Sequence, residues 1–318
     1  MNDQAAGMAF RIGFLLIDGF ALMSYSAAVE PLRAANLLAG RILYDVRHIP
    51  VSGERSRSSS GAEIPATARI GEPVDFDLVL VVAGGDPSAF ASQKAFAWLR
   101  MLASRGVMIG GVSGGPFVLA RAGVMQGRRM TVHWEHAEAL LAMRPDTILE
   151  RSLYVVDRDR MTCAGGAAAL DMMHALIAGH HGQAFATRVS DWFVHTDVRP
   201  SGGPQRAGIA ERYRTANGFL LAAIQAMQDH IADPLPVGAL ASRAGVGERQ
   251  LTRLFTKEMK RSPMAFYRDL RLDTARGLVV QSGLSMTDIA LACGFANSAH
   301  FSQAYAKRFG QAPSRDRG

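Results

Sequence analysis

Two segments near the C-terminal end of this 318-residue chain repeat one pattern. Residues 237–255 (VGALASRAGVGERQLTRLF) and 286–305 (MTDIALACGFANSAHFSQAY) each hold two apolar runs with helical spacing, separated by a glycine. The two glycines, Gly245 and Gly294, lie 49 residues apart. Because glycine adopts positive φ readily, each segment predicts two helices joined by a tight turn. The chain is therefore expected to end in an all-α domain with two helix-turn-helix units.

Small and apolar side chains occupy the positions that such units need for packing. Ala241 and Ala290 would let paired helices approach closely. The expected anchors of the second helices are Leu251, Leu254, Phe255, Phe301 and Tyr305. The other helix faces remain free to enter a DNA groove.

The charge distribution favours a polyanionic partner for the same region. From Gly218 onward the chain has 13 Lys and Arg against 8 Asp and Glu, whereas residues 1–217 have 22 against 20. The excess positive charge is therefore concentrated in the C-terminal third.

The first half alternates short apolar runs with helical patterns, which is typical of a parallel sheet covered by helices. Expected strands are residues 10–17, 77–82 and 107–111, and expected helices are 89–105, 116–122 and 167–178. A hairpin is expected to pair residues 153–156 with 161–164. These elements predict an α/β domain.

Proline, glycine and serine gather in residues 197–205 (DVRPSGGPQ), which indicates a linker. We expect an N-terminal domain over residues 8–195, a linker over 196–217 and a DNA-binding domain over 218–318. No strand is expected beyond residue 217, and residues 56–60 (SRSSS) are expected to form a surface loop.

Composition argues against several classes of protein. No apolar run reaches 18 residues, and the start MNDQAAGMAF lacks the features of a secretory signal, so a cytoplasmic protein without a membrane span is expected. Two cysteines, Cys163 and Cys293, are too few for a disulfide framework or a zinc knuckle. We expect no metal site and no cofactor.

Residues 233–313 resemble the AraC/XylS family of transcription regulators, in particular through LASRAGVGERQLTRLFTKEMKRSPMAFYRDLRLDTAR and DIALACGFANSAHFSQAYAKRFGQAPS. The resemblance implies seven helices, with a long helix, matched here to residues 263–281, that holds two helix-turn-helix units on one face of double-stranded DNA.

The same resemblance implies which side chains meet DNA. Base contacts are expected from Arg249, Thr252, Arg253, Ser298, His300 and Gln303. Arginine and glutamine suit this task because they form bidentate hydrogen bonds with guanine and adenine. Phosphate contacts are expected from Lys257, Lys307 and Arg308.

Residues 111–115 (GVSGG) match the nucleophile elbow, in which a serine lies on a strained turn between strand and helix. His133 follows 20 residues after Ser113, and the amides of Gly84 and Gly85 are candidates for an oxyanion site. One hypothesis is therefore a serine hydrolase that uses Ser113 and His133. No acidic residue is placed by sequence to orient the histidine.

Residues 8–190 resemble PfpI-like, class I glutamine-amidotransferase-like domains, through Glu30, the GGD at 84–86 and VSGGPFVLARAGVMQGRRMTVHW at 112–134. The resemblance implies a flavodoxin-like α/β sandwich. Catalytic members carry cysteine at the elbow, where this chain has Ser113. Serine lacks the thiolate reactivity of cysteine, so a pocket without turnover is implied. Cys163 is expected to be a buried packing residue.

Together the two resemblances match the architecture of GlxA-type AraC regulators. They imply a transcriptional activator that senses a small-molecule effector, such as an amine, betaine or amino acid. They also imply a homodimer that contacts RNA polymerase. A sheet domain used only for dimerisation remains an alternative.

A small ligand is expected in the crevice at the carboxyl ends of the parallel strands. The candidate ligand-binding residues are Glu30, Gly85, Ser113, His133 and Trp134. Glu30 could pair with a cationic ligand, and Trp134 could offer a cation-π face.

Overall fold

The chain is described from a computed structural model that covers residues 8–317, except for the side chain of Gln281. These residues divide into two compact units, one ending at Gln205 and the other beginning at Arg206. Residues 1–7, part of the start in which no signal peptide is expected, lie outside the described residues.

The first unit is built on a six-stranded sheet in the order β2-β1-β5-β6-β10-β9. Neighbouring strands are parallel except for the antiparallel hairpin β9–β10. Strands covered on both faces favour unbroken apolar runs, as in the LVLVVA of β5. The strands are β1 Phe10–Leu16, β2 Tyr44–Pro50, β5 Leu78–Ala83, β6 Met108–Ser113, β9 Tyr154–Asp157 and β10 Arg160–Cys163. The expected α/β architecture and its hairpin are confirmed.

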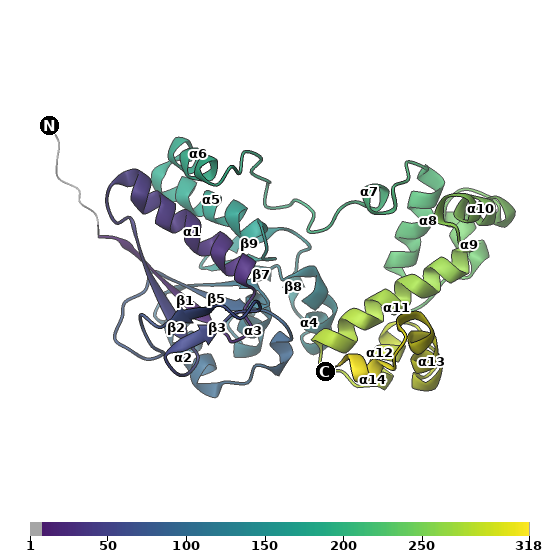
Figure 1. The fold of residues 1–318 in the computed structure, drawn as a ribbon, viewed down its shortest axis with the longest axis horizontal. Coiled ribbons are helices and arrows are strands. Elements are labelled where there is room, and N and C mark those ends of the chain that lie inside the picture. The colour runs from purple at the N-terminus through teal and green to yellow at the C-terminus, as the bar shows by residue number, and fades with distance from the viewer. Residues whose placement is uncertain (1–7, 318) are drawn as a thin grey trace. The chain divides into compact units, whose positions relative to one another are not determined.

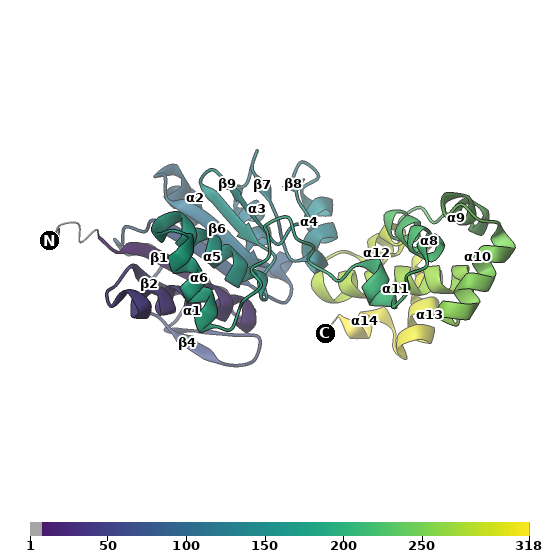
Figure 2. The same cartoon turned by 90° about the horizontal axis from the view of Figure 1, so that it is seen from above.

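Helices cover both faces of this sheet. One face packs against α1 Leu22–Ala39, α5 Ala168–His181 and α6 Gln183–Trp192, which lie side by side (Figure 1; Figure 2). The other face packs against α2 Gln93–Ser104, α3 Gly115–Ala122 and α4 Ala137–Met143.

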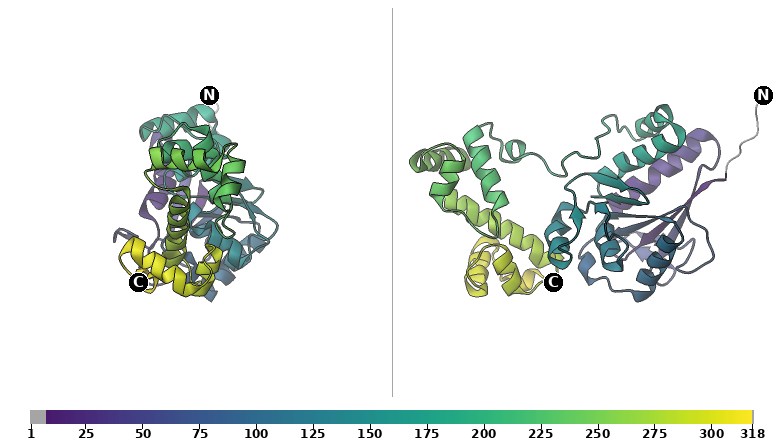
Figure 3. Two further views of the ribbon diagram at one scale, coloured as in Figure 1. Left: turned by 90° about the vertical axis from the view of Figure 1, so that its right-hand side faces the viewer. Right: turned by 180° about the vertical axis from the view of Figure 1, so that it is seen from behind.

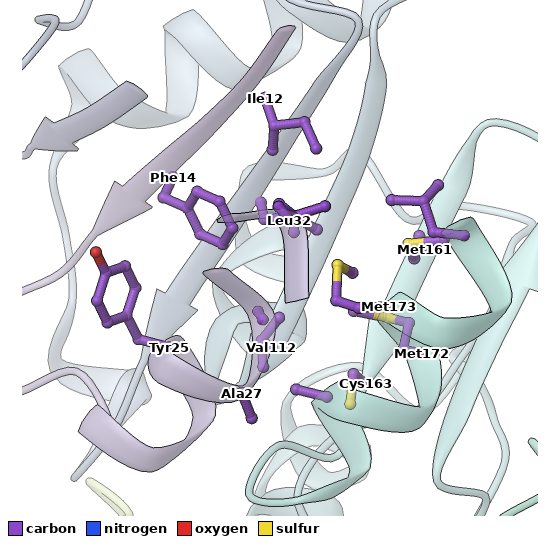
Figure 4. Packing of buried hydrophobic residues seen from close by; sticks show 14 of the residues in the cluster. Ile12, Phe14, Tyr25, Ala27, Leu32, Val112, Met161, Cys163, Met172 and Met173 are labelled. Carbon is purple, nitrogen blue, oxygen red and sulfur yellow. The ribbon is translucent and has the colours of Figure 1, made fainter. Parts of the chain in front are cut away.

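Alternation along the strands divides the apolar side chains between two cores. In β5, Leu80 faces the α1 side, whereas Val81 faces the α3 side. In the first core, Phe14 and Leu32 lie on the sheet and on α1, with Met172 of α5 close by (Figure 4).

Two short pairs of strands lie outside the main sheet. They are β3 Arg55–Arg57 with β4 Glu63–Pro65, and β7 Arg129–Met130 with β8 Ile148–Leu149. The first pair corrects the expected surface loop at residues 56–60. Ser56 is buried and its hydroxyl donates to the carbonyl oxygen of Leu16 at 3.0 Å, so a polar run here satisfies a buried backbone group.

The helix expected over residues 89–105 begins later, at Gln93. The Ser92 hydroxyl accepts a hydrogen bond from the backbone amide of Ala95 at 3.3 Å and caps the helix. Residues Pro87–Ala89 form a separate 3-10 turn, capped by Asp86. The Ser92 cap therefore starts this helix four residues later than the apolar pattern predicted.

The second unit is helical throughout its described residues. After α7 Ile209–Tyr213 come seven α-helices, in agreement with the expected number. They are α8 Gly218–Asp229, α9 Val237–Arg243, α10 Glu248–Leu254, α11 Pro263–Gln281, α12 Met286–Ala292, α13 Ser298–Phe309 and α14 Pro313–Asp316. A π-helical turn, Phe255–Met259, continues α10. Both helix-turn-helix units are confirmed, α9–α10 and α12–α13.

The long helix α11 runs between the two helix-turn-helix units (Figure 3). It contributes to two separate cores of the second unit. Phe266 and Tyr267 pack with α8, α9 and α10. Leu272 and Val279 pack with α12 and α13. Gly245 and Gly294 turn the chain between paired helices at φ of 73° and 69°. None of the described helices is long and apolar enough to cross a lipid bilayer.

Replacing glycine by alanine should have opposite effects on stability at two positions of the first unit. A Cβ on Gly115 would lie 1.9 Å from the carbonyl oxygen of Val81, whereas a Cβ on Gly179 of α5 meets nothing within 4 Å. Gly115→Ala should destabilise the unit by roughly 3 kcal/mol or more through overpacking. Gly179→Ala should stabilise it by about 1 kcal/mol, because alanine is the better helix former. Urea unfolding followed by circular dichroism measures both, and equal changes in the two variants would contradict the close packing at Gly115.

Candidate functional site

Strand β6 ends at Ser113, whose φ of 61° lies in the left-handed region that non-glycine residues rarely adopt. Helix α3 begins two residues later. The flanking glycines permit this turn, since a Cβ on Gly111 would lie 2.5 Å from the backbone nitrogen of Pro116. The GVSGG pattern therefore builds the expected strained elbow through close backbone packing.

The elbow is enclosed by residues from other strand ends. A Cβ on Gly165, just after β10, would lie 2.7 Å from Ser113 Cβ and 2.7 Å from Ser24 Oγ. Ser24, in the first turn of α1, accepts a hydrogen bond at its Oγ from the amide of Gly166 at 2.7 Å. Ser113 itself is only 6% exposed.

Sequence reasoning missed Ser24. The available signal is its position in the sequence. Ser24 lies in the first turn of the helix that follows β1, and only β5 lies between β1 and β6 in the sheet. Carboxyl ends of parallel strands share one edge, so polar residues just beyond them meet there.

The elbow lacks a donor that a hydrolase would use there. In the nucleophile elbow the amide after the nucleophile helps to form the oxyanion hole. Here that amide, on Gly114, donates to the carbonyl oxygen of Ala83 at 3.1 Å. The described geometry therefore commits this N–H to the backbone of β5.

His133 lies beside the elbow and is joined to it through the backbone. Its amide donates to the carbonyl oxygen of Ser113 at 3.3 Å. Its ring nitrogen Nδ1 lies 3.5 Å from the carboxylate of Glu135. The His133 ring is 5.4 Å from the ring of Trp134, which is 37% exposed. The structure thus brings Ser113, His133 and Trp134 into one neighbourhood.

The remaining two candidate residues lie differently. Gly85 is exposed just after β5, at φ 60°. Glu30 lies six residues after Ser24 on α1, about 9 Å along the helix axis at 1.5 Å per residue. Its carboxylate pairs with the Arg33 side chain, with 2.7 Å between Nε and Oε2. The structure therefore does not bring Glu30 to the elbow, where Ser24 lies instead.

Cys163 lies within the core between the sheet and α5, as expected (Figure 4). Burial raises the pKa of its thiol to about 12, so the group stays protonated and unreactive. Among the described residues, no cluster of three or more metal-ligating side chains occurs.

In the second unit, the expected DNA-contacting side chains of α10 point to solvent. Arg249, Thr252 and Arg253 are exposed, whereas Leu251 of the same helix is fully buried. Lys257 is exposed on the following π-helical turn. One face of α10 therefore packs and the other is available.

In α13, the exposed side chains of His300, Gln303 and Lys307 follow helical spacing. Ser298 begins this helix and is half-buried. The three exposed side chains line one wall of a groove of about 520 Å³ between α13 and α11. Exposed side chains that were expected to contact DNA thus line a concave surface.

Basic side chains of the linking region form the opposite wall of this groove. Arg261, just before α11, and Arg268 within it both line the groove. Sequence reasoning missed them because it treated the long helix as a spacer. The charge of Arg268 adds to that of Lys307 across the groove, whereas the Arg261 guanidinium forms an ion pair with Asp269, which also lines the groove.

Arg308 is held by two carboxylates of α11. Its Nη2 lies 2.6 Å from the Oδ1 of Asp273, and its Nη1 lies 3.1 Å from the Oδ2 of Asp269. These ion pairs fix α13 against α11 and balance the charge that was expected to contact phosphate. Arg271 also fixes the second helix-turn-helix unit against α11. Its Nε donates to the carbonyl oxygen of Cys293, in the turn between α12 and α13, at 2.7 Å.

Family models match both units. Residues 10–179 match the DJ-1/PfpI family, and residues 240–318 match a helix-turn-helix domain.

Characterised relatives span nearly the whole chain. The HTH-type transcriptional regulator GlxA of Rhizobium meliloti is 46% identical over 304 residues, which cover 95% of this chain and 94% of that protein. The HTH-type transcriptional regulator CdhR of Pseudomonas aeruginosa is 40% identical, over 96% of this chain and 90% of that protein.

Solved structures also resemble this chain. An AraC family transcriptional regulator from Pseudomonas putida superposes with a TM-score of 0.53 and 26% identity, over 58% of this chain and 99% of that one. A ThiJ/PfpI family protein from Pseudomonas syringae has a TM-score of 0.52 at 23% identity, over 77% of this chain and 97% of that one, and shares the fold.

His136 predicts a pH dependence of stability. It is buried beside His133, and burial, followed by repulsion from His133, lowers its pKa from 6.5 to about 4. As the pH falls from about 6.5 to 4, the His136 side chain therefore binds a proton in the unfolded chain but stays neutral in the folded chain. Between pH 7 and 4.5 this group should remove roughly 2 to 3 kcal/mol of stability.

The measurement is urea unfolding of wild type and His136→Leu at several pH values. The variant should lose less stability on acidification, because its other titrating groups are shared with wild type. Parallel pH profiles for the two proteins would show that His136 remains protonatable in the fold.

Proposed function

This chain belongs to the HTH-type transcriptional regulators that join a DJ-1/PfpI domain to an AraC-type DNA-binding domain, and from that premise we propose that its first unit senses a small metabolite without turning it over. The second unit then carries the response to promoter DNA. The observation that supports this most directly is the pair of helix-turn-helix units held by α11, each with exposed polar side chains on its second helix.

The proposed division of labour on DNA follows side-chain chemistry. Base edges are contacted by Arg249, Thr252, Arg253, Ser298, His300 and Gln303. Lys257 and Lys307 contact phosphates, and Arg261 and Arg268 join them across the groove. Arg308 chiefly holds α13 in place, although its remaining N–H groups can also meet a phosphate.

Two neighbouring positions should give different effects on binding. Arg253→Ala should relax specificity at one base position at a cost of about 1 to 3 kcal/mol, since a bidentate base contact is lost. Lys257→Ala should weaken all sequences alike and reduce the slope of log K against log salt by about 0.9. Fluorescence anisotropy of the full-length protein measures both, on promoter and scrambled duplexes at two salt concentrations. An equal loss on both duplexes for Arg253→Ala would assign that side chain to the backbone instead.

The effector is proposed to occupy the neighbourhood of Ser113, His133 and Trp134, with Gly85 at its rim. The exposed Trp134 ring suits a cationic amine, betaine or amino acid through cation-π attraction. Glu30 already forms an ion pair with Arg33, so a direct contact between Glu30 and a cationic effector is less favourable. Activation through a homodimer that meets RNA polymerase in the cytoplasm completes the proposal.

A serine hydrolase at the elbow is the competing function, and Ser113→Ala distinguishes the two. In a sensor the change should alter effector response by about 1 kcal/mol, the worth of one hydrogen bond, with no product formed by either protein. In a hydrolase it should abolish turnover, as removal of a triad nucleophile costs about six orders of magnitude in kcat. Commitment of the Gly114 amide to Ala83 supports the first outcome.

The assay follows product formation from ester and amide substrates, with wild type and Ser113→Ala side by side, and thermal shift with amines, betaines and amino acids. Wild-type turnover that disappears in the variant would replace the sensor by an enzyme.

A further inference from the structure

Residues 195–205, the last of the first unit, form an irregular segment that lies against it and that we call the strap. The composition of this segment predicted that a linker begins at residue 196. Instead, the backbone carbonyl of Ser201 accepts hydrogen bonds from the amides of Leu153 and Tyr154 at 2.8 and 3.4 Å. The strap therefore pairs with the start of the edge strand β9.

A buried carboxylate fixes one end of the strap. Asp171 of α5 has no exposed surface. Its Oδ1 accepts from the His195 ring at 2.8 Å and from the Arg199 amide at 3.0 Å. Its Oδ2 accepts from the Arg199 guanidinium at 2.6 and 3.0 Å. A buried carboxylate that lost these partners would be left uncompensated, so docking of this end is strongly favoured.

The other end of the strap reaches the elbow through one peptide group. The Gln205 Nε2 lies 3.1 Å from the carbonyl oxygen of Val132. The N–H of that same peptide unit belongs to His133 and donates to the carbonyl oxygen of Ser113 at 3.3 Å. A peptide group is planar and rigid, so movement on one side tilts the hydrogen-bonding group on the other.

Gln205 has two further oxygens within reach of the same nitrogen. They are Thr131 Oγ1 at 3.0 Å and the Ser152 carbonyl at 2.8 Å. The Gln205 Oε1 is buried without a hydrogen-bond partner among the described residues. Release of a side-chain amide costs less free energy when its oxygen already lacks a hydrogen-bond partner than when its donors and its acceptor are all bonded. This end of the strap is therefore the one suited to switching.

We propose that the strap is a two-state coupling element: occupancy of the elbow tilts the Val132–His133 peptide, weakens the hold on Gln205 and releases the part of the strap beyond Arg199, while Asp171 keeps the other end docked. The proposal rests on the proposed sensor function and names its regulation. Release would add residues 200–205 to the free tether of the DNA-binding unit, up to about 20 Å of extended chain. The effector would thus act on DNA binding by changing the reach of the second unit.

Hydrogen exchange of the full-length chain, read by mass spectrometry, tests the coupling without a known effector. Two substitutions perturb the elbow. Gly165→Ala inserts a methyl against Ser113 and Ser24, and Ser24→Ala removes the acceptor for the Gly166 amide. The readout is exchange in peptides from residues 150–156, which contain the Leu153 and Tyr154 amides that donate to Ser201 in the docked strap.

Each elbow variant should raise exchange in these peptides by about threefold or more, as expected of a weakened local closure. In a Gln205→Met background the elbow substitutions should cause almost no further increase in exchange, because the hydrogen bond from Gln205 to the Val132 carbonyl is already absent. In a matched Gln225→Met background the increase should persist, since Gln225 bonds only Asp229 on α8 in the described contacts.

Strap exchange that ignores both elbow variants, or responds equally in the Gln205→Met background, overturns the coupling. Ser24→Ala keeps the test valid if Gly165→Ala does not fold, and circular dichroism decides that. The exchange experiment contains no DNA. Its failure therefore leaves the regulator function intact, whereas failure of the wild type to bind promoter DNA would reject that function and leave the strap result standing.

Discussion

The β6–α3 turn packs its backbone directly against the end of β5. A Cβ on Gly115 would lie 1.9 Å from the carbonyl oxygen of Val81, and the Gly114 amide bonds the carbonyl of Ala83. This backbone contact holds Ser113 at positive φ and directs α3 back across the sheet. It also withdraws from the elbow the N–H that an oxyanion would need. One packing constraint thus creates the shape of a catalytic elbow while removing part of its chemistry.

Elements with strong local signals were predictable from sequence, and long-range hydrogen bonds were not. The helix over residues 263–281 was expected from the family resemblance with both bounds as observed, and Ser262 and Pro263 start it. The strap was expected to be a linker, because proline and glycine carry no information about a partner 28 residues away. Arg199 bonds Asp171 only after the fold brings them together.

The candidate site was likewise predictable only in part. Ser113 and His133 were found through a local pattern that the packing of glycines enforces. Glu30, which came from the family resemblance, was expected in the crevice at the strand ends, but it lies six residues, about 1.7 helical turns, past Ser24, and Ser24 lies at the elbow. Position after a parallel strand was the only available signal for Ser24.

Helix α11 belongs to two cores at once, through Tyr267 on one side and Leu272 on the other. Because each residue turns a helix by about 100° and advances it by about 1.5 Å, the number of residues between these two anchors sets the angular phase of α13 relative to α10. A single insertion there would rotate one recognition helix by more than a quarter turn while leaving each core intact. The spacing and phase of the two DNA segments that this protein can read together are therefore encoded in the length of one helix.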